Sequence, residues 1–214
     1  MSDPQHNGAI GPPQPMIAAC VASHARLVDH LEKVDDVVLR RPSRLQGWSI
    51  GHVLTHLARN ADSFVRMLEA AEMGESVSQY PGGKDQRDGD IETGAARSAA
   101  ACVNDVARSN ARLEKAFSTA SAAAWDGAGV WMSGQQAPCR RFPFRRWREV
   151  EFHMVDLGLG YEPESWPPEF VSLALSDTLA ELPPRIADGA QRASLLAWLA
   201  GRRQTPGTIE FAPF

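Results

Sequence analysis

Apolar residues recur at intervals of three and four along four stretches of the chain, which is the period of an amphipathic helix. These stretches span residues 17–31, 50–68, 99–117 and 144–157. Ser49 precedes the second stretch and is a typical helix N-cap, while Gly74 lies where that helix should end. The fourth stretch opens after Pro143 and is stopped by Gly158 and Gly160. The pattern predicts a mainly all-α fold built on an antiparallel four-helix bundle.

Two long segments separate the later helices of this bundle. Residues 75–90 contain Pro81 and three glycines, and residues 124–142 form a connection of similar length. We expect both segments to be loops. Loops of this length in a compact domain often carry function.

The chain divides into three parts by composition. Residues 1–15 are polar and rich in proline and glycine, so we expect a disordered tail, and residues 16–160 hold the bundle. Residues 161–214 form a C-terminal region that is too small for much of a core of its own, so we expect it to pack on the bundle. Its pattern predicts two short helices, the first ended by Pro183 and Pro184, and a short strand. These elements are expected at residues 170–182, 191–200 and 208–211.

Composition and charge narrow the class of protein. The 214 residues are 43% hydrophobic, which suits one compact domain with a small appendage. A net charge of -4 offers no basic surface for a nucleic acid, and no apolar run reaches the roughly 18 residues that a membrane span needs. The N-terminus lacks the basic start and apolar core of a signal peptide. Cys20, Cys102 and Cys139 show no paired spacing, so we expect free thiols in a cytoplasmic protein.

The residues with the clearest chemical potential lie on the second and fourth helices. On a helix, Glu149, His153 and Asp156 stack along one face at spacings of four and three. The second helix carries His52 and His56, one turn apart. One of these imidazoles together with Glu149 and His153 would leave an open coordination position, as in a catalytic zinc site. The spacing alone leaves the choice between His52 and His56 open.

Five further residues are candidates for the surroundings of that site. Arg87 and Arg202 are candidate catalytic residues, since the planar guanidinium matches the two oxygens of a carboxylate. Trp48 and Trp147 flank the proposed ligands and are expected to wall a cofactor-binding pocket. His24 lies on the apolar face of the first helix, which favours a core or supporting position over direct metal ligation, and we count it with the cofactor-binding candidates.

Three segments carry a family resemblance. Residues 47–61 read GWSIGHVLTHLARNA, residues 148–158 read REVEFHMVDLG, and residues 199–202 read LAGR. The first two resemble the second and fourth helices of the thiol-dependent maleylpyruvate isomerases, in the DinB-like metal-binding bundle superfamily. The third resembles the end of the C-terminal region of those proteins. The resemblance covers the bundle from about residue 16 to residue 160.

The resemblance implies a set of site residues. By position, the zinc ligand of the second helix falls on His56 and not on His52, and the others are Glu149 and His153. The family uses arginines for the substrate carboxylates. Arg202 matches well in its Ala-Gly-Arg context, and Arg87 matches more loosely.

The resemblance also implies an activity, the zinc- and thiol-dependent conversion of maleylpyruvate to fumarylpyruvate in gentisate-type aromatic degradation. In that chemistry a thiolate adds to the cis double bond, the bond rotates, and elimination gives the trans product. The C-terminal region is longer in mycothiol-using members, so glutathione and mycothiol are both expected candidates for the thiol. The partner would be a small dicarboxylate substrate. Two alternatives remain open: a thiol S-transferase on the same bundle, and a metal-free binding or stress-response module.

Overall fold

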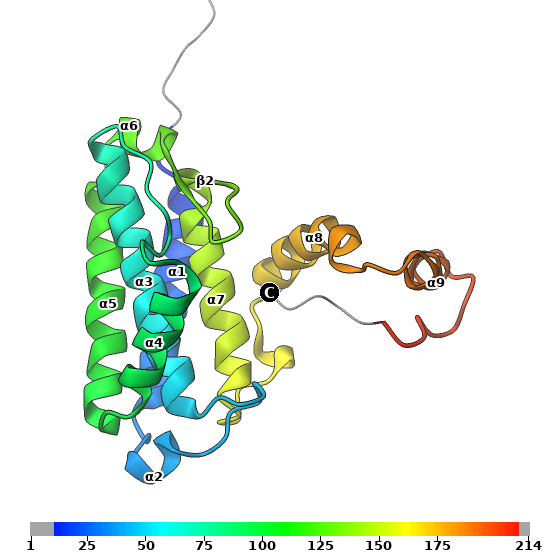
Figure 1. Cartoon of the computed structure of the whole chain (residues 1–214), viewed down its shortest axis with the longest axis horizontal. Helices are drawn as coiled ribbons and strands as arrows, with labels where there is room; N and C mark the ends of the chain where they lie inside the picture. Colours follow the sequence, from blue (N-terminus) through cyan, green and yellow to red (C-terminus); the bar gives the residue numbers. More distant parts are fainter. Residues whose placement is uncertain (1–10, 210–214) are drawn as a thin grey trace, which may run out of the picture. The chain divides into compact units, whose positions relative to one another are not determined.

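The bundle is built from four helices that lie side by side (Figure 1). We describe the protein from a computed structural model, which covers residues 11–209. The bundle helices are α1 (Gln14–Leu31), α3 (Ile50–Glu72), α5 (Ala99–Thr119) and α7 (Phe142–Asp156). The predicted all-α fold is confirmed. Helix α3 is capped by Ser49, and Gly74 follows its end with a φ of +74°. Within the described residues, no helix is long and apolar enough to cross a membrane.

Inward-facing apolar side chains from these helices form the core. Helix α1 contacts α5 and α7, and helix α3 contacts the same two neighbours. The core therefore lies along the axis that the four helices share. Fully buried members of it are Leu27, Val53, Leu57, Val106, Val150 and Met154.

A helix that the sequence did not indicate determines the directions of the others. Residues 75–90 were expected to be a loop, but α4 (Gly83–Ala95) occupies much of this segment and packs against α3. It carries the chain back along α3, so that α3 and α5 run parallel, as the ion pairs Arg59–Asp105 and Asp62–Arg112 show. Only three residues of α4 are buried, and its Gly- and Asp-rich sequence has no apolar stripe to reveal it.

The second predicted loop, residues 124–142, is also partly ordered into regular elements. A two-stranded antiparallel sheet pairs Ala128 with Pro138 and Val130 with Gln136. Strands of three residues are too short to show an alternating pattern, which is why the sequence did not predict them. The strands of this sheet are β1 (Ala128–Val130) and β2 (Gln136–Pro138), and α6 (Ala122–Asp126) and η1 (Cys139–Arg141) flank it. Two other short elements of the first 165 residues are α2 (Asp36–Leu39) and η2 (Pro163–Ser165).

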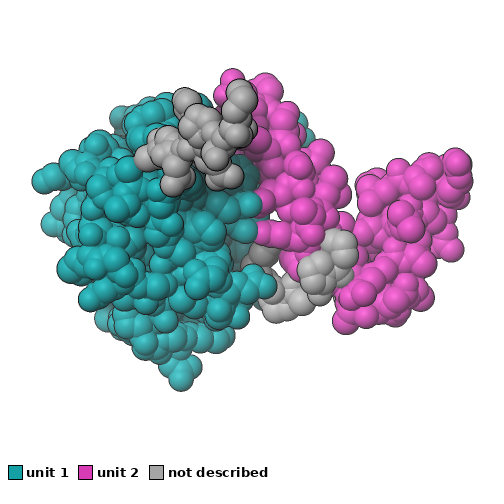
Figure 2. All heavy atoms as spheres, turned by 90° about the horizontal axis from the view of Figure 1, so that it is seen from above, with its two compact units in different colours: residues 1–165 teal, residues 166–214 magenta. Residues whose placement is uncertain are grey.

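The chain divides into two compact units, residues 1–165 and residues 166–214 (Figure 2). The second unit contains α8 (Pro168–Arg185) and α9 (Gly189–Leu199). Helix α8 runs to Arg185, so the predicted stop at Pro183 was wrong by about one turn. Most of the predicted tail, residues 1–10, and the end of the predicted strand, residues 210 and 211, lie outside the described residues; Gln14 and Pro15, at the end of that tail, are helical.

Helices α3 and α4 approach closely because α4 presents a glycine at their contact. A Cβ atom added at Gly94 would lie 2.2 Å from Thr55 Cγ2, and Thr55 is a buried β-branched residue that has little freedom to move. Gly89, on the same helix, has no heavy atom within 4 Å of such a Cβ position. The first glycine is thus required by packing and the second is not.

We predict that Gly94→Ala lowers the free energy of unfolding by about 1–3 kcal/mol, because the added methyl group overpacks the contact between the two helices. The matched substitution Gly89→Ala should raise it by about 0.5–1 kcal/mol, since alanine favours the helix. Urea denaturation of the two variants measures both values. Equal effects of the two substitutions would show that α4 does not pack as described.

Candidate functional site

The side chains of His56, Glu149 and His153 meet on the inner faces of α3 and α7. His56 Nε2 lies 3.0 Å from Glu149 Oε2, and His153 Nε2 lies 3.5 Å from the same oxygen. The imidazole rings of His56 and His153 have centroids 4.8 Å apart, in an edge arrangement. One ligand atom from each residue lies within 4.8 Å of the other two. Within the part of the chain that the structure describes, this is the one group of three or more such residues.

His52 lies one turn before His56 and has a different part in the structure. Its backbone N–H donates to Ser49 Oγ, and its Nδ1 accepts a hydrogen bond from the Ser49 backbone N–H at 3.2 Å, which forms a capping box at the start of α3. Its Nε2 is 3.1 Å from Glu92 on α4. The structure therefore brings His56, and not His52, together with Glu149 and His153.

The three groups perturb one another strongly. Burial lowers the pKa of His56 to about 4, with the hydrogen bond to Glu149 acting in the opposite direction. Burial also lowers the pKa of His153, but hydrogen bonds to Asp156 and Glu149 outweigh it and raise the value to about 9. For Glu149, burial raises the pKa, yet the hydrogen bonds from both histidines hold it well below its usual range. The site thus contains a carboxylate, a neutral imidazole and a protonated imidazole.

This donor set fits a divalent cation. Two imidazoles and one carboxylate are the ligands of several catalytic zinc sites. In tetrahedral zinc coordination, neighbouring ligand atoms are about 3.4 Å apart, and the two distances to Glu149 Oε2 bracket that value. His153 Nδ1 also lies 2.8 Å from Asp156 Oδ2, which would orient the ring as the outer carboxylates of zinc sites do.

An arginine and an aromatic residue line the side of the site next to α3. The Arg87 guanidinium, on α4, donates to His56 Nδ1 at 3.3 Å and lies 5.7 Å above the centre of the Trp48 ring. Trp48 is in turn 5.7 Å from the His56 ring. An arginine has no acceptor, so His56 Nδ1 carries no proton and its Nε2–H donates to Glu149. The sequence-based candidates Arg87 and Trp48 are therefore both at the triad.

The structure shows the exposure of Arg202 and of the three cysteines. Arg202 is exposed and belongs to the second unit, just after α9. Cys20, Cys102 and Cys139 are free and buried. Burial raises the pKa of the Cys20 thiol to about 12 and that of Cys139 to about 11, and it also raises the pKa of Cys102.

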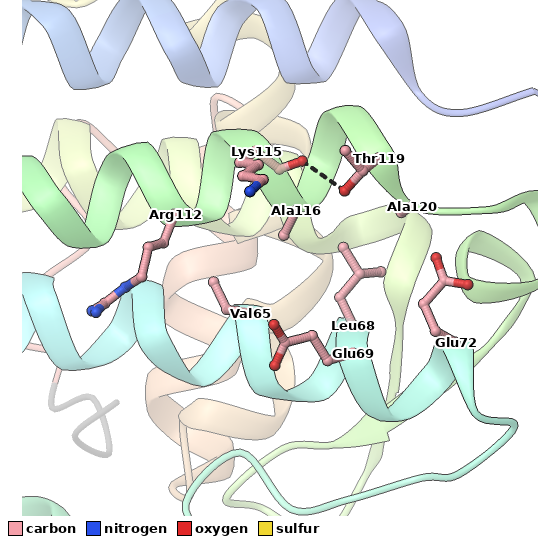
Figure 3. Close-up of a pocket in the computed structure, with 9 residues that line it drawn as sticks. All are labelled: Val65, Leu68, Glu69, Glu72, Arg112, Lys115, Ala116, Thr119 and Ala120. Carbon is pink, nitrogen blue, oxygen red and sulfur yellow. Dashed lines mark hydrogen bonds between the residues drawn. The ribbon is translucent and has the colours of Figure 1, made fainter.

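A separate hollow lies between α3 and α5 (Figure 3). It contains none of the candidate residues, and its lining mixes acidic, basic and small side chains. It is therefore not part of the site described above. The lining residues are Val65, Leu68, Glu69, Glu72, Arg112, Lys115, Ala116, Thr119 and Ala120.

The family model and the solved structures that match the chain are described by the same enzyme name. Residues 20–158 match the family model described as the mycothiol maleylpyruvate isomerase N-terminal domain. The chain is similar to a crystal structure of the mycothiol-dependent maleylpyruvate isomerase, with 25% identity, a TM-score of 0.73, and coverage of 78% of this chain and 69% of that chain. A histidine-to-alanine mutant of the mycothiol-dependent maleylpyruvate isomerase gives the same TM-score and coverage at 24% identity. No curated protein matches the chain.

A buried arginine, Arg146, lies near the triad and was not predicted from the sequence. Arg146 is fully buried and donates to Leu57 O at 2.9 Å, to Asn60 Oδ1 and Asn110 Oδ1 at 2.8 Å, and to His24 Nε2 at 3.1 Å. The sequence does contain a signal for it. Arg146 precedes the apolar Val150 by four positions, so both side chains fall on the inward face of α7.

Two of the predicted cofactor-binding residues, His24 and Trp147, lie in the buried interior around Arg146. His24 is buried, accepts from Arg146 and pairs with Glu114, while Trp147 is buried and donates to Glu151, a second buried charge that the sequence did not indicate. Both side chains lie in the interior on the side of α7 that faces α1. The geometry gives no support to a cofactor-binding role for either of them.

We predict that His24 makes the free energy of unfolding depend on pH. Burial lowers the pKa of His24 from 6.5 to about 4, so between these values the unfolded chain binds a proton that the folded protein does not. Stability should therefore fall as the pH drops through 6.5 towards 4. In His24→Gln the amide can still accept from Arg146 and donate to Glu114 but cannot titrate. With both proteins free of metal, the free energy of unfolding of the variant should fall by roughly 1–3 kcal/mol less than that of wild type between pH 6.5 and pH 4. Identical pH profiles would contradict the assignment.

Proposed function

The chain belongs to the family of the mycothiol maleylpyruvate isomerase N-terminal domain, and on this basis we propose that it catalyses the thiol-dependent cis–trans isomerisation of maleylpyruvate to fumarylpyruvate. The observation that carries the proposal is the meeting of His56, Glu149 and His153 on two facing helices. The similar solved structures are described as mycothiol-dependent maleylpyruvate isomerases. The reaction would serve gentisate-type aromatic degradation.

We propose that these three residues hold a divalent metal, with zinc as the first candidate. A zinc ion there would supply a Lewis acid that deprotonates a coordinated thiol, which gives a nucleophile for the cis double bond at neutral pH. The protein must release the proton of His153 before this residue can act as a ligand, so metal binding should be weaker in acid. Asp156 would keep the His153 ring in the required orientation.

Arg87 is the proposed partner of a substrate carboxylate. When His56 Nε2 serves as a ligand, the proton of the neutral imidazole must sit on Nδ1, so Arg87 can no longer donate to that atom. The guanidinium is mostly buried beside Trp48 and pairs with Asp88 through Nη1 at 2.7 Å, so Nη2 is the donor that would then be free for an anionic ligand. Arg202 remains a candidate for a second carboxylate on the strength of its sequence context.

The similar proteins support mycothiol as the first thiol to test, because the matching family model and solved structures are described as mycothiol enzymes. Glutathione is the second candidate. Trp48 offers an aromatic wall beside the triad for a bound thiol or substrate.

We predict that the purified protein binds one zinc ion per chain and that His56→Ala, Glu149→Ala and His153→Ala each abolish this binding. Each substitution removes one of only three protein ligands. Asp156→Asn should weaken zinc binding roughly 10- to 100-fold, because the outer hydrogen bond to His153 changes. Metal analysis after dialysis and titration with a competing chelator measure both effects.

The matched control is His52→Ala, which removes a histidine one turn away from the triad. It should keep full zinc content and lose only the half of the capping box that the imidazole supplies and the contact with Glu92, at about 0.5–1.5 kcal/mol of stability. If His52→Ala loses zinc while His56→Ala retains it, the proposed ligand set is wrong.

We predict that loss of maleylpyruvate absorbance requires both the metal and an added low-molecular-weight thiol. The thiol should be recovered unchanged, since addition and elimination regenerate it. Mycothiol, glutathione and thiol-free buffer, each with exhaustively dialysed and zinc-reloaded enzyme, form the comparison. Full activity without thiol would refute the mechanism, and stoichiometric consumption of the thiol would instead identify an S-transferase.

A further inference from the structure

Tyr80 is buried beside the triad with an unsatisfied hydroxyl. The residue is only 8% exposed, and among the described residues no group hydrogen-bonds to its Oη. The chain has one other tyrosine, Tyr161, whose hydroxyl donates to the buried carboxylate of Glu151 at 2.5 Å. Buried tyrosine hydroxyls normally find a partner, so an exception calls for a physical explanation.

The surroundings of Tyr80 place its phenol at the site. The Arg87 guanidinium lies 6.0 Å from the centre of the Tyr80 ring, and the same guanidinium donates to His56. Burial and the Glu149 carboxylate raise the pKa of the phenol, while Arg87 and Ser63 approach its hydroxyl and lower the value, although neither makes a hydrogen bond of good geometry to it. Ser63 follows His56 by two turns on α3 and so lies on the same helix face. The phenol is therefore surrounded by elements that carry the triad and Arg87.

The backbone holds Tyr80 in this position. On one side, Ser78 and Gln79 pair with Val130 of β1, where the Gln79 N–H donates to the Val130 carbonyl at 2.8 Å. On the other side, Gly83 N–H donates to the Tyr80 carbonyl at 3.0 Å, just where α4 begins. The backbone on both sides of Tyr80 is thus held in place by hydrogen bonds, which limits how far the residue can move when a ligand arrives.

We propose that Tyr80 is a substrate-binding residue whose hydroxyl donates to an oxygen of the anionic ligand held by Arg87. A protonated phenol next to a guanidinium provides two converging donors, one neutral and one charged, which suits an oxygen that carries negative charge. This proposal rests on the proposed function for the identity of the substrate. It goes beyond it by assigning the site a second donor, from the segment before α4.

Tyr80→Phe tests the proposal, with Tyr161→Phe as the matched control. The Tyr80 variant removes a buried hydroxyl that makes no hydrogen bond of good geometry to the described residues, so its thermal unfolding temperature should equal or exceed that of wild type. Its kcat/KM for maleylpyruvate should fall roughly 10- to 100-fold, as expected for one hydrogen bond to a charged oxygen. The Tyr161 variant should show the reverse, with lower thermal stability and unchanged kcat/KM. Unchanged kcat/KM in Tyr80→Phe would overturn the proposal, as would a loss of activity explained by a lowered unfolding temperature.

A binding measurement separates this proposal from the proposed function. Calorimetry of the zinc-loaded proteins with maleate, a cis dicarboxylate, needs no turnover. Wild type and Tyr161→Phe should bind maleate equally, and Tyr80→Phe should bind it roughly 10- to 100-fold more weakly. If wild type does not isomerise maleylpyruvate, the proposed function fails and the maleate result alone decides the Tyr80 assignment. No maleate binding by wild type, or equal binding by Tyr80→Phe, would overturn it.

Discussion

The structure depends on one buried cation, Arg146 of α7. Its guanidinium is fully buried, and its acceptors come from each of the other three bundle helices. A buried charge that lost these partners would be very costly, so the helices can pack only in the register where all the acceptors meet. That register also positions the site. His56 directly precedes Leu57, whose carbonyl Arg146 contacts, and Glu149 follows Arg146 by about one turn. The triad therefore forms where the buried network has already aligned α3 with α7.

The four bundle helices could be predicted because each carries a continuous apolar stripe, and two of them, α3 and α7, also carry boundary signals. Helix α4 could not, since its sequence is largely polar and only its last turns are buried. Without α4, the directions of the bundle helices could not be predicted either, because this helix carries the chain back along α3 and makes α3 and α5 parallel neighbours. Helix direction is set by such connections, and periodicity alone says nothing about them. The pairs His24–Arg146 and Arg26–Glu151 show that α1 and α7 also run parallel.

The site could be predicted as a set of residues but only in part as an arrangement. Spacing along α7 brought out Glu149 and His153, while the partner on α3 stayed ambiguous because two histidines one turn apart share a helix face. The cap at Ser49 resolves this, since it engages the first of the two. Trp147 was expected at the pocket, yet it turns towards Glu151, because neighbouring positions on a helix point about 100° apart. Tyr80 had no periodic signal at all, as it lies in an irregular segment.

The burial of the three cysteines has a consequence for a protein that we propose works with a small thiol. Only a thiolate exchanges with disulfides, and buried thiols with raised pKa values have almost none at neutral pH. The protein therefore has no nucleophilic sulfur of its own that could form a mixed disulfide with an oxidised cofactor. It can remain in a redox-active thiol pool without becoming covalently trapped by that pool, so the only reactive sulfur at the site would be the one that arrives with the ligand.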